Sequence, residues 1–206
     1  MVAAAAVAAF VLFCALWLGY APIVRLFGPG AINAGLGPVR TLWMVAMVQR
    51  DNRIVDSQLI GHVMHSATFF ASTSILAVGA LLGVLTGLDR LQPAVEALSM
   101  TPSIPRGLLE LKLLLPVAVL THGMFNLTWA LRQMNYTLAL LGAVPPPPVA
   151  DAEALARPIA AVLSNALTTF NTGIRNYYFA LAALTWLGGP VPLAVTALVL
   201  MAVLVH

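Results

Sequence analysis

Charged side chains are scarce in this sequence, and their scarcity limits the surroundings in which the chain can fold. Only 8% of the 206 residues are charged, while 61% are hydrophobic. A soluble domain usually has about a quarter charged residues, so these few charges cannot cover a water-exposed surface. We therefore expect lipid to surround much of the protein. The ten basic residues are scattered, without the basic run and interleaved aromatic residues that would indicate a nucleic-acid partner.

Cysteine and catalytic motifs are also rare or missing. Cys14 is the only cysteine, so an intrachain disulfide is excluded, and its apolar surroundings predict a buried structural thiol. The sequence has no nucleophile elbow, phosphate-binding loop, dinucleotide-binding glycine pattern or paired CxxC motif. The few carboxylates fall in expected loops and interfaces, which argues against catalysis by paired carboxylates. The sequence favours a non-enzymatic protein and leaves an enzymatic activity open.

Long apolar stretches are what the sequence has in abundance, and several approach or exceed the roughly 20 residues that cross a bilayer. We expect an all-α fold, a polytopic transmembrane helical bundle of four to five spans that forms a single domain over residues 1–206. No basic residue precedes Arg25, so the first stretch is predicted to be a retained span and not a signal peptide. The expected spans cover residues 2–26, 58–88, 107–132, 155–187 and 190–205, the last of which is short for a full crossing.

The segment between the first two spans divides into two parts. Glycine and proline dominate residues 28–38, which predicts a loop. Residues 39–53 mix apolar and charged side chains near helical spacing. This pattern predicts a short amphipathic helix at the membrane surface, with Trp43 at the depth of the lipid headgroups.

Other segments show helix caps and connectors. Asp56 and Ser57 supply N-cap chemistry to the second span. A loop containing Pro93 is expected after that span ends. The four prolines at 145–148 predict a short, stiff polyproline connector between the third and fourth spans.

The distribution of arginines predicts the orientation in the membrane. Loops that face the cytoplasm have an excess of basic residues. We therefore expect a cytoplasmic first loop and an N-terminus on the outer side. The arginines on the predicted cytoplasmic side are Arg25, Arg40, Arg50, Arg53 and Arg132.

Polar side chains inside the expected spans form the candidate site. Such groups are costly in hydrocarbon, so we expect them to face protein or water. His62 and His65 share one helix face with Ser72, Gly79 and Gly83, and small residues at this spacing predict a packing seam. The full set is His62, His65, Ser72, His122, Asn126, Asn165, Thr168, Asn171, Arg175 and Asn176.

Two arrangements of these polar groups are predicted. His62, His65 and His122 are expected at similar depth in the inner half of the membrane. The fourth expected span is the most polar one, with Asn165, Thr168 and Asn176 on one face, and is therefore expected at the centre of the bundle.

Three interpretations of the polar groups stay open. They form contacts between helices in a structural or accessory subunit that packs against other membrane proteins, which is the favoured interpretation and needs no cofactor. They line a path for a proton, an ion or a small solute, with Arg175 as its gate or as its contact for an anion. Or His62, His65 and His122 bind a haem iron or another metal, because neutral imidazole is a common ligand. Expected partners are membrane lipids, another copy of the chain or a larger membrane complex.

Two blocks of sequence resemble the bacterial branch of the family called domain of unknown function 599. The first block includes Arg40–Met44 (RTLWM), Arg50–Asp56 (RDNRIVD) and Phe69–Leu76 (FFASTSIL), and the second is Phe170–Leu181 (FNTGIRNYYFAL). The resemblance implies a bacterial inner-membrane protein, in which the outer side would be the periplasm, and it brings no catalytic residues. Because both blocks coincide with the polar stretches, we also expect Ser72 or Thr73 to contact Asn171 or Arg175.

Overall fold

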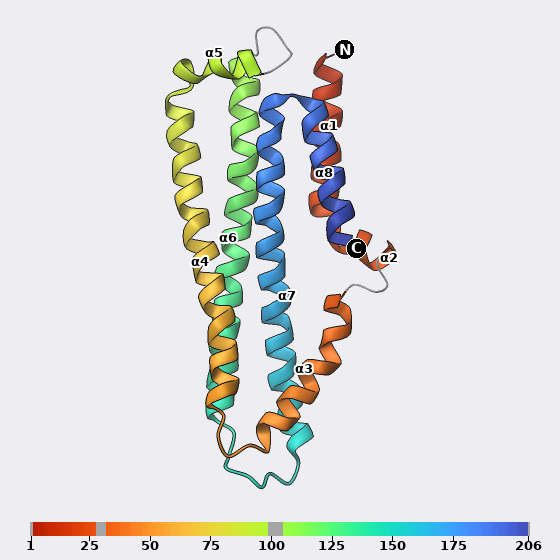
Figure 1. Ribbon diagram of the computed structural model, residues 1–206, viewed down its shortest axis with the longest axis vertical. Coiled ribbons are helices and arrows are strands. Elements are labelled where there is room, and N and C mark those ends of the chain that lie inside the picture. The colour runs from red at the N-terminus through yellow and green to blue at the C-terminus, as the bar shows by residue number, and fades with distance from the viewer. Residues whose placement is uncertain (1, 28–31, 99–104, 206) are drawn as a thin grey trace. The chain divides into compact units, whose positions relative to one another are not determined.

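The computed structural model describes residues 2–27, 32–98 and 105–205, and these residues contain helices but no strand. The predicted all-α class is therefore confirmed for the described chain. In chain order the elements are α1 (Val2–Leu18), α2 (Tyr20–Phe27), α3 (Ile32–Val48), α4 (Ile54–Thr86), α5 (Leu88–Leu98), α6 (Arg106–Gly142), α7 (Ala152–Leu184), the 3₁₀ turn η1 (Thr185–Gly188) and α8 (Pro190–Val205) (Figure 1).

Two of these helices, α4 and α6, are long and apolar enough to cross a membrane. They have 33 and 37 residues, which at 1.5 Å per residue exceeds the roughly 30 Å of a bilayer's hydrocarbon core. Shorter apolar segments lie in α1, α3 and α8. The described part of the chain therefore has two helices that are both long and apolar enough to span a membrane, and a count of four to five spans stays a prediction.

Two predicted loops are helical where the structure describes them. Residues 28–31 lie outside the described residues, but α3 already begins at Ile32 and includes Pro38, and it ends at Val48 instead of continuing to residue 53. Likewise Pro93 lies inside α5. Proline costs a helix about 3 kcal/mol and glycine about 1 kcal/mol. In α3 the burial of apolar side chains such as Met44 and Met47 offsets that cost.

The chain divides into two compact units, and α4, α6 and α7 contribute to both. Unit 1 consists of residues 1–31, 74–123 and 175–206, and unit 2 of residues 32–73 and 124–174. The prediction of a single domain is not decided by this division, because three continuous helices run through both units.

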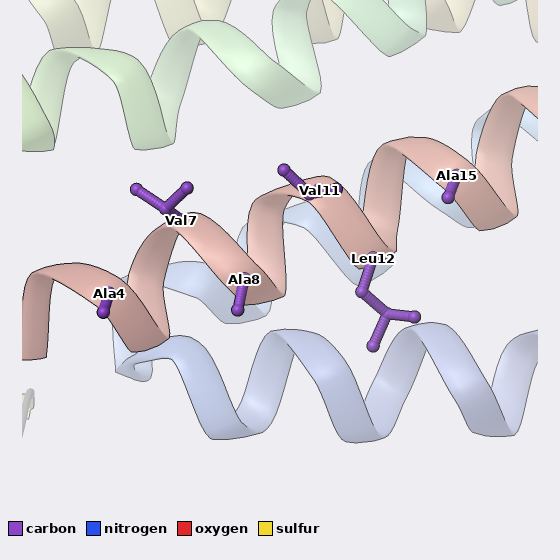
Figure 2. A pocket seen from close by; sticks show the side chains of 6 residues that line it. All are labelled: Ala4, Val7, Ala8, Val11, Leu12 and Ala15. Atoms are coloured by element: carbon purple, nitrogen blue, oxygen red, sulfur yellow. The ribbon is translucent and has the colours of Figure 1, made fainter. Parts of the chain in front are cut away.

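Aromatic side chains build the core of unit 1, where α1 packs along α8. Phe13 and Phe179 meet edge to face at 5.8 Å, and Phe10 stacks on Trp186 at 5.4 Å. Cys14 is half-buried beside this core. A hollow of about 820 Å³ along α1 is lined by Ala4, Val7, Ala8, Val11, Leu12 and Ala15 (Figure 2). Because none of these side chains is polar, the hollow offers no group that would orient a polar ligand.

The core of unit 2 combines methionine, isoleucine and leucine with small residues. One cluster contains side chains of α3, α4, α6 and α7, among them Met44, Ile60, Met134 and Ile159. In a second cluster, Ala67 and Ala71 of α4 pack with Leu127 of α6, and Leu131 lies against it. These contacts place residues 67–71 of α4 beside residues 127–131 of α6 within unit 2.

Candidate functional site

A buried carboxylate joins α3 to the start of α4 in unit 2. Asp56 Oδ1 accepts the indole N–H of Trp43 at 2.7 Å and an N–H of Arg50 at 2.5 Å. The Asp56 side chain is fully buried, whereas that of Arg50 is 45% exposed. Asp56 Oδ2 has no hydrogen-bond partner among the described residues. We call Trp43, Arg50 and Asp56 the Asp56 cluster.

The N-terminus of α4 is capped by Asn52, so the prediction that Asp56 and Ser57 form the cap was wrong. Asn52 Oδ1 accepts the backbone N–H of Ile54 at 2.9 Å. The Ser57 hydroxyl donates to the Ile54 carbonyl at 2.8 Å. The helix begins earlier than expected because asparagine can satisfy the free N–H groups of the first turn. Asp56 is thereby placed inside the helix, where it faces α3.

Arg53 binds backbone carbonyls instead of a carboxylate. Its guanidinium donates to Val144 O at 2.6 Å, Pro145 O at 2.7 Å, Val48 O at 3.1 Å and Met47 O at 3.4 Å. Two of these carbonyls end α3 and two follow α6. A cation at the carbonyl end of a helix is stabilised by the helix dipole. Arg53 therefore closes the end of α3 and ties it to the connector between α6 and α7.

A second tie joins the same connector to α3. The Gln49 side-chain amide donates to Val149 O at 2.9 Å and accepts the Val149 N–H at 3.3 Å. Beside it lies a hollow of about 800 Å³ that combines polar and apolar walls. It is lined by Asp51, Asn52, Arg53, Ile54, Ser57, Leu138, Leu141 and Gly142.

Asn176 is the centre of a polar contact in unit 1. It is 3% exposed, and its Oδ1 accepts the indole N–H of Trp17 at 2.5 Å and lies 3.2 Å from His122 Nδ1. Because an amide oxygen can only accept, His122 Nδ1 is the donor in this contact. The Trp17 ring also meets the His122 ring edge to face at 5.6 Å. Two predicted site residues, His122 and Asn176, are thus brought together.

Arg175 lies over an aromatic ring of the same unit. Its guanidinium carbon is 3.8 Å from the ring centroid of Tyr20, a cation–π contact. The Tyr20 hydroxyl donates to Leu204 O at 3.1 Å. Arg175, Tyr20 and Leu204 therefore connect α7, α2 and α8.

The histidines of α4 point outward. His62 and His65 are exposed, and they precede Ala67, which packs in one cluster with Leu127 and Leu131 of α6. The pair therefore lies level with the last turns of α6, where Arg132 begins the more polar part of that helix. The described residues contain no group of three His, Cys, Asp or Glu side chains that could hold a metal ion.

The stripe predicted as a packing seam on α4 faces away from the described chain. Ser72, Gly79 and Gly83 are exposed, and a Cβ atom added at either glycine would meet nothing within 4 Å. Thr73 donates to Phe69 O of its own helix at 2.8 Å. The share of buried residues in the most apolar window is 11% for α4 and 44% for α6. If the stripe packs, its partner lies outside the part of the chain that the structure describes.

The polar face of α7 also points outward in unit 2. Asn165 and Thr168 are exposed, whereas Ile159 and Leu163 are buried. The Thr168 hydroxyl donates to the Ser164 carbonyl, four residues earlier in its own helix, at 2.8 Å, and such bonds satisfy hydroxyls without a second helix. In unit 2 the core side of α7 is therefore apolar, and the central position expected for this helix stays a prediction. Asn126 and Asn171 are half-buried, and both interact with other groups of the chain.

The family model for the protein of unknown function DUF599 matches residues 8–206, nearly the whole chain. The chain belongs to the DUF599 family. No curated protein and no solved structure matches it. In this DUF599 protein, the segment Arg50–Asp56 supplies two members of the Asp56 cluster, Arg50 and Asp56, as well as the Asn52 cap and the Arg53 contacts. The segment Phe170–Leu181 supplies Asn176.

Reasoning from the sequence missed several partners in these contacts. Trp17 and Tyr20 gave no signal, because their contacts with α7 and α8 connect residues far apart in the chain. Asp56 was recognised only as a cap. The RDNRIVD segment of this DUF599 protein was the available signal, since it has four charged residues in an otherwise apolar chain.

Proposed function

We propose that this protein is a non-enzymatic integral protein of the bacterial inner membrane whose helix α4 packs against other membrane proteins. The observation that supports the proposal most is the exposure of α4. This helix is long and apolar enough to cross a membrane, yet only 11% of its most apolar window is buried.

The composition of the exposed α4 stripe favours protein over lipid as its neighbour. Ser72, Gly79 and Gly83 follow at steps of seven and four, so they lie on one helix face. Small residues at such spacing let another helix approach closely, and this close packing drives association in a membrane. A surface that faces only lipid does not need small residues, because bulky apolar side chains suit lipid equally well.

Disulfide cross-linking in native membranes tests whether the stripe meets a second copy of the chain. In a Cys14→Ala background, Gly79→Cys should form a dimer-sized band on oxidation. Ala80→Cys is the matched control, because Ala80 is small and exposed but lies about 100° around the helix from Gly79. Equal cross-linking of both variants, or none, would count against a specific interface between copies.

Substitution of the glycines tests the interface by a second route. Because a Cβ at Gly79 or Gly83 meets nothing within 4 Å, Gly79→Leu/Gly83→Leu should leave the fold of each copy intact. We expect the particle mass in mild detergent to fall to that of the monomer in this variant, while Ala80→Leu keeps the mass of the unmodified protein. The proposal would be overturned if the unmodified protein is strictly monomeric and binds no other membrane protein.

The proposed orientation places the end of α4 that holds Asp56 in the cytoplasm and the N-terminus in the periplasm. It is supported by the basic residues Arg50, Arg53 and Arg132, all of which lie in unit 2, and by the excess of such residues in cytoplasmic loops. Asp51→Cys in the Cys14→Ala background should react with a membrane-impermeant thiol reagent only after the cells are opened. Labelling in intact cells would reverse the orientation.

A haem- or metal-binding function is a second candidate, and the contact of His122 with Asn176 favours it. Histidines that bind metals usually donate their other ring N–H to an oxygen, and Asn176 Oδ1 lies 3.2 Å from His122 Nδ1. The absorption spectrum and metal content of the purified protein test this function. Without a Soret band and without a stoichiometric metal, it would be rejected.

A further inference from the structure

An arginine on α6 is held between two exposed aromatic rings in unit 2. The guanidinium carbon of Arg132 lies 5.5 Å from the ring centroid of Trp129 and 5.7 Å from that of Tyr136. Its Nε donates to the Tyr136 hydroxyl at 2.6 Å. Trp129 and Tyr136 are 50% and 47% exposed. These three residues, the Arg132 cluster, therefore form a surface feature whose guanidinium is fixed in direction.

Arg132 has no counter-ion within the part of the chain that the structure describes. The ion pairs found there involve Arg50, Arg106 and Arg157. An arginine stays charged at every physiological pH, so an anion that neutralises Arg132 has to come from another molecule. A guanidinium whose plane is fixed presents its terminal N–H groups as a fork that matches two oxygens of a phosphate.

The position of Arg132 along α6 indicates where that anion lies. Residues 113–131 contain no charged side chain, and this run of 19 residues is about 28 Å long, close to the thickness of a hydrocarbon core. Arg132 is the next residue and therefore lies where lipid phosphates begin. Tryptophan and tyrosine are enriched at the same depth.

An apolar side chain continues the cluster toward the hydrocarbon. Phe125, Trp129, Arg132 and Tyr136 follow at steps of four, three and four residues, so they share one helix face. Phe125 is 63% exposed. A ligand with both a phosphate and an acyl chain would contact Arg132 at one end and Phe125 at the other, which inorganic phosphate cannot do.

We propose that the Arg132 cluster binds the phosphodiester group of an anionic phospholipid, with an acyl chain along Phe125. The charge favours phosphatidylglycerol over phosphatidylethanolamine, because Arg132 has no carboxylate partner among the described residues and phosphatidylglycerol brings a net negative charge, whereas the ammonium group of phosphatidylethanolamine cancels the charge of its phosphate. This inference rests on the membrane insertion contained in the proposed function, and it does not depend on association through α4.

Native mass spectrometry of the full chain in detergent tests the inference, with phosphatidylglycerol, phosphatidylethanolamine or inorganic phosphate added. We expect the protein to retain phosphatidylglycerol about tenfold more tightly than phosphatidylethanolamine. Arg132→Gln should remove this preference, and Arg132→Lys should remove most of it because an ammonium group cannot bind two oxygens in a fork. Arg157→Gln is the matched control, since Arg157 is an exposed arginine that already pairs with Glu153 at 2.6 Å.

Two results would overturn the inference. Equal retention of phosphatidylglycerol by the unmodified protein and by Arg132→Gln would show that the cluster does not bind the lipid. Displacement of the lipid by millimolar inorganic phosphate would show that the phosphate alone is recognised. The variant Gly79→Leu/Gly83→Leu, measured in parallel, should keep its lipid while its particle mass falls. A failure of lipid binding is thereby distinguished from a failure of association through α4.

Discussion

The indole N–H of Trp43 donates to the buried carboxylate of Asp56 at 2.7 Å, and this bond joins the middle of α3 to the first turn of α4. Arg50 reaches the same carboxylate oxygen from the turn between the two helices. Because Asp56 is fully buried, its charge would be costly without these two donors. The charged segment that contains Arg50 and Asp56 therefore links α3 to α4 in unit 2.

Removing the Asp56 carboxylate should destabilise unit 2. In Asp56→Ala the indole N–H of Trp43 loses its acceptor. We expect the free energy of unfolding to fall by about 2 kcal/mol, less than for a fully buried pair because Arg50 is partly exposed to solvent. Asp56→Asn keeps an oxygen that can accept from Trp43 and should lose less. Thermal unfolding in detergent measures both. Asp51→Ala, in the same turn but exposed, should stay within about 0.5 kcal/mol of the unmodified protein.

Arg53 should not be replaceable by lysine. Its guanidinium contacts four backbone carbonyls, with Val144 O at 2.6 Å and Pro145 O at 2.7 Å as the shortest, while an ammonium group has three donors at a single point. We expect Arg53→Lys to cost about 2 kcal/mol in unfolding free energy and to increase proteolysis in the connector between α6 and α7. Arg157→Lys, an exposed position on α7, should show neither effect. Equal proteolysis of the two variants would contradict a structural role for Arg53.

The long helices could be predicted from the sequence, because their ends are marked by charges and prolines. The predicted span 107–132 lies within α6, and the predicted span 155–187 covers most of α7 but continues past its end at Leu184 into η1. The prediction failed where glycine and proline were taken as sufficient to end a helix. Pro38 and Pro93 lie inside α3 and α5, since the cost of one proline is local and contacts elsewhere along the helix can offset it.

The arrangement of the polar residues could be predicted only in part. That His62 and His65 share a face follows from helical spacing alone. The face of α4 that packs cannot be predicted in this way, because the helix has apolar side chains on all of its sides and no clear apolar stripe. The contact of Asn176 with Trp17 joins residues 159 positions apart, a separation over which spacing in the sequence carries no information.

Trp17 and Asn176 should be energetically coupled. The bond between them is 2.5 Å long and Asn176 is buried, so a double-mutant cycle with Trp17→Phe and Asn176→Ala should give a coupling energy of about 1 kcal/mol. The ¹⁵N spectrum of the unmodified protein should show His122 protonated at Nδ1, and Asn176→Ala should abolish this preference. Protonation at Nε2 alone in the unmodified protein would mean that His122 does not donate to Asn176.

Thiol accessibility along α7 separates a packing module from a water-filled path. In the Cys14→Ala background, cysteines at Asn165 and Thr168 should react with a water-soluble reagent wherever water covers them, since both positions are exposed. Where lipid covers them, they should not react. A cysteine at Asn176 should be protected, because that side chain is 3% exposed and accepts from Trp17. A path for ions or small solutes requires water at every level of the polar face. Rapid labelling at Asn176 together with Asn165 and Thr168 would therefore favour a carrier or channel. Protection at Asn176 would instead show that no continuous water-filled path follows the polar face of α7 through that position.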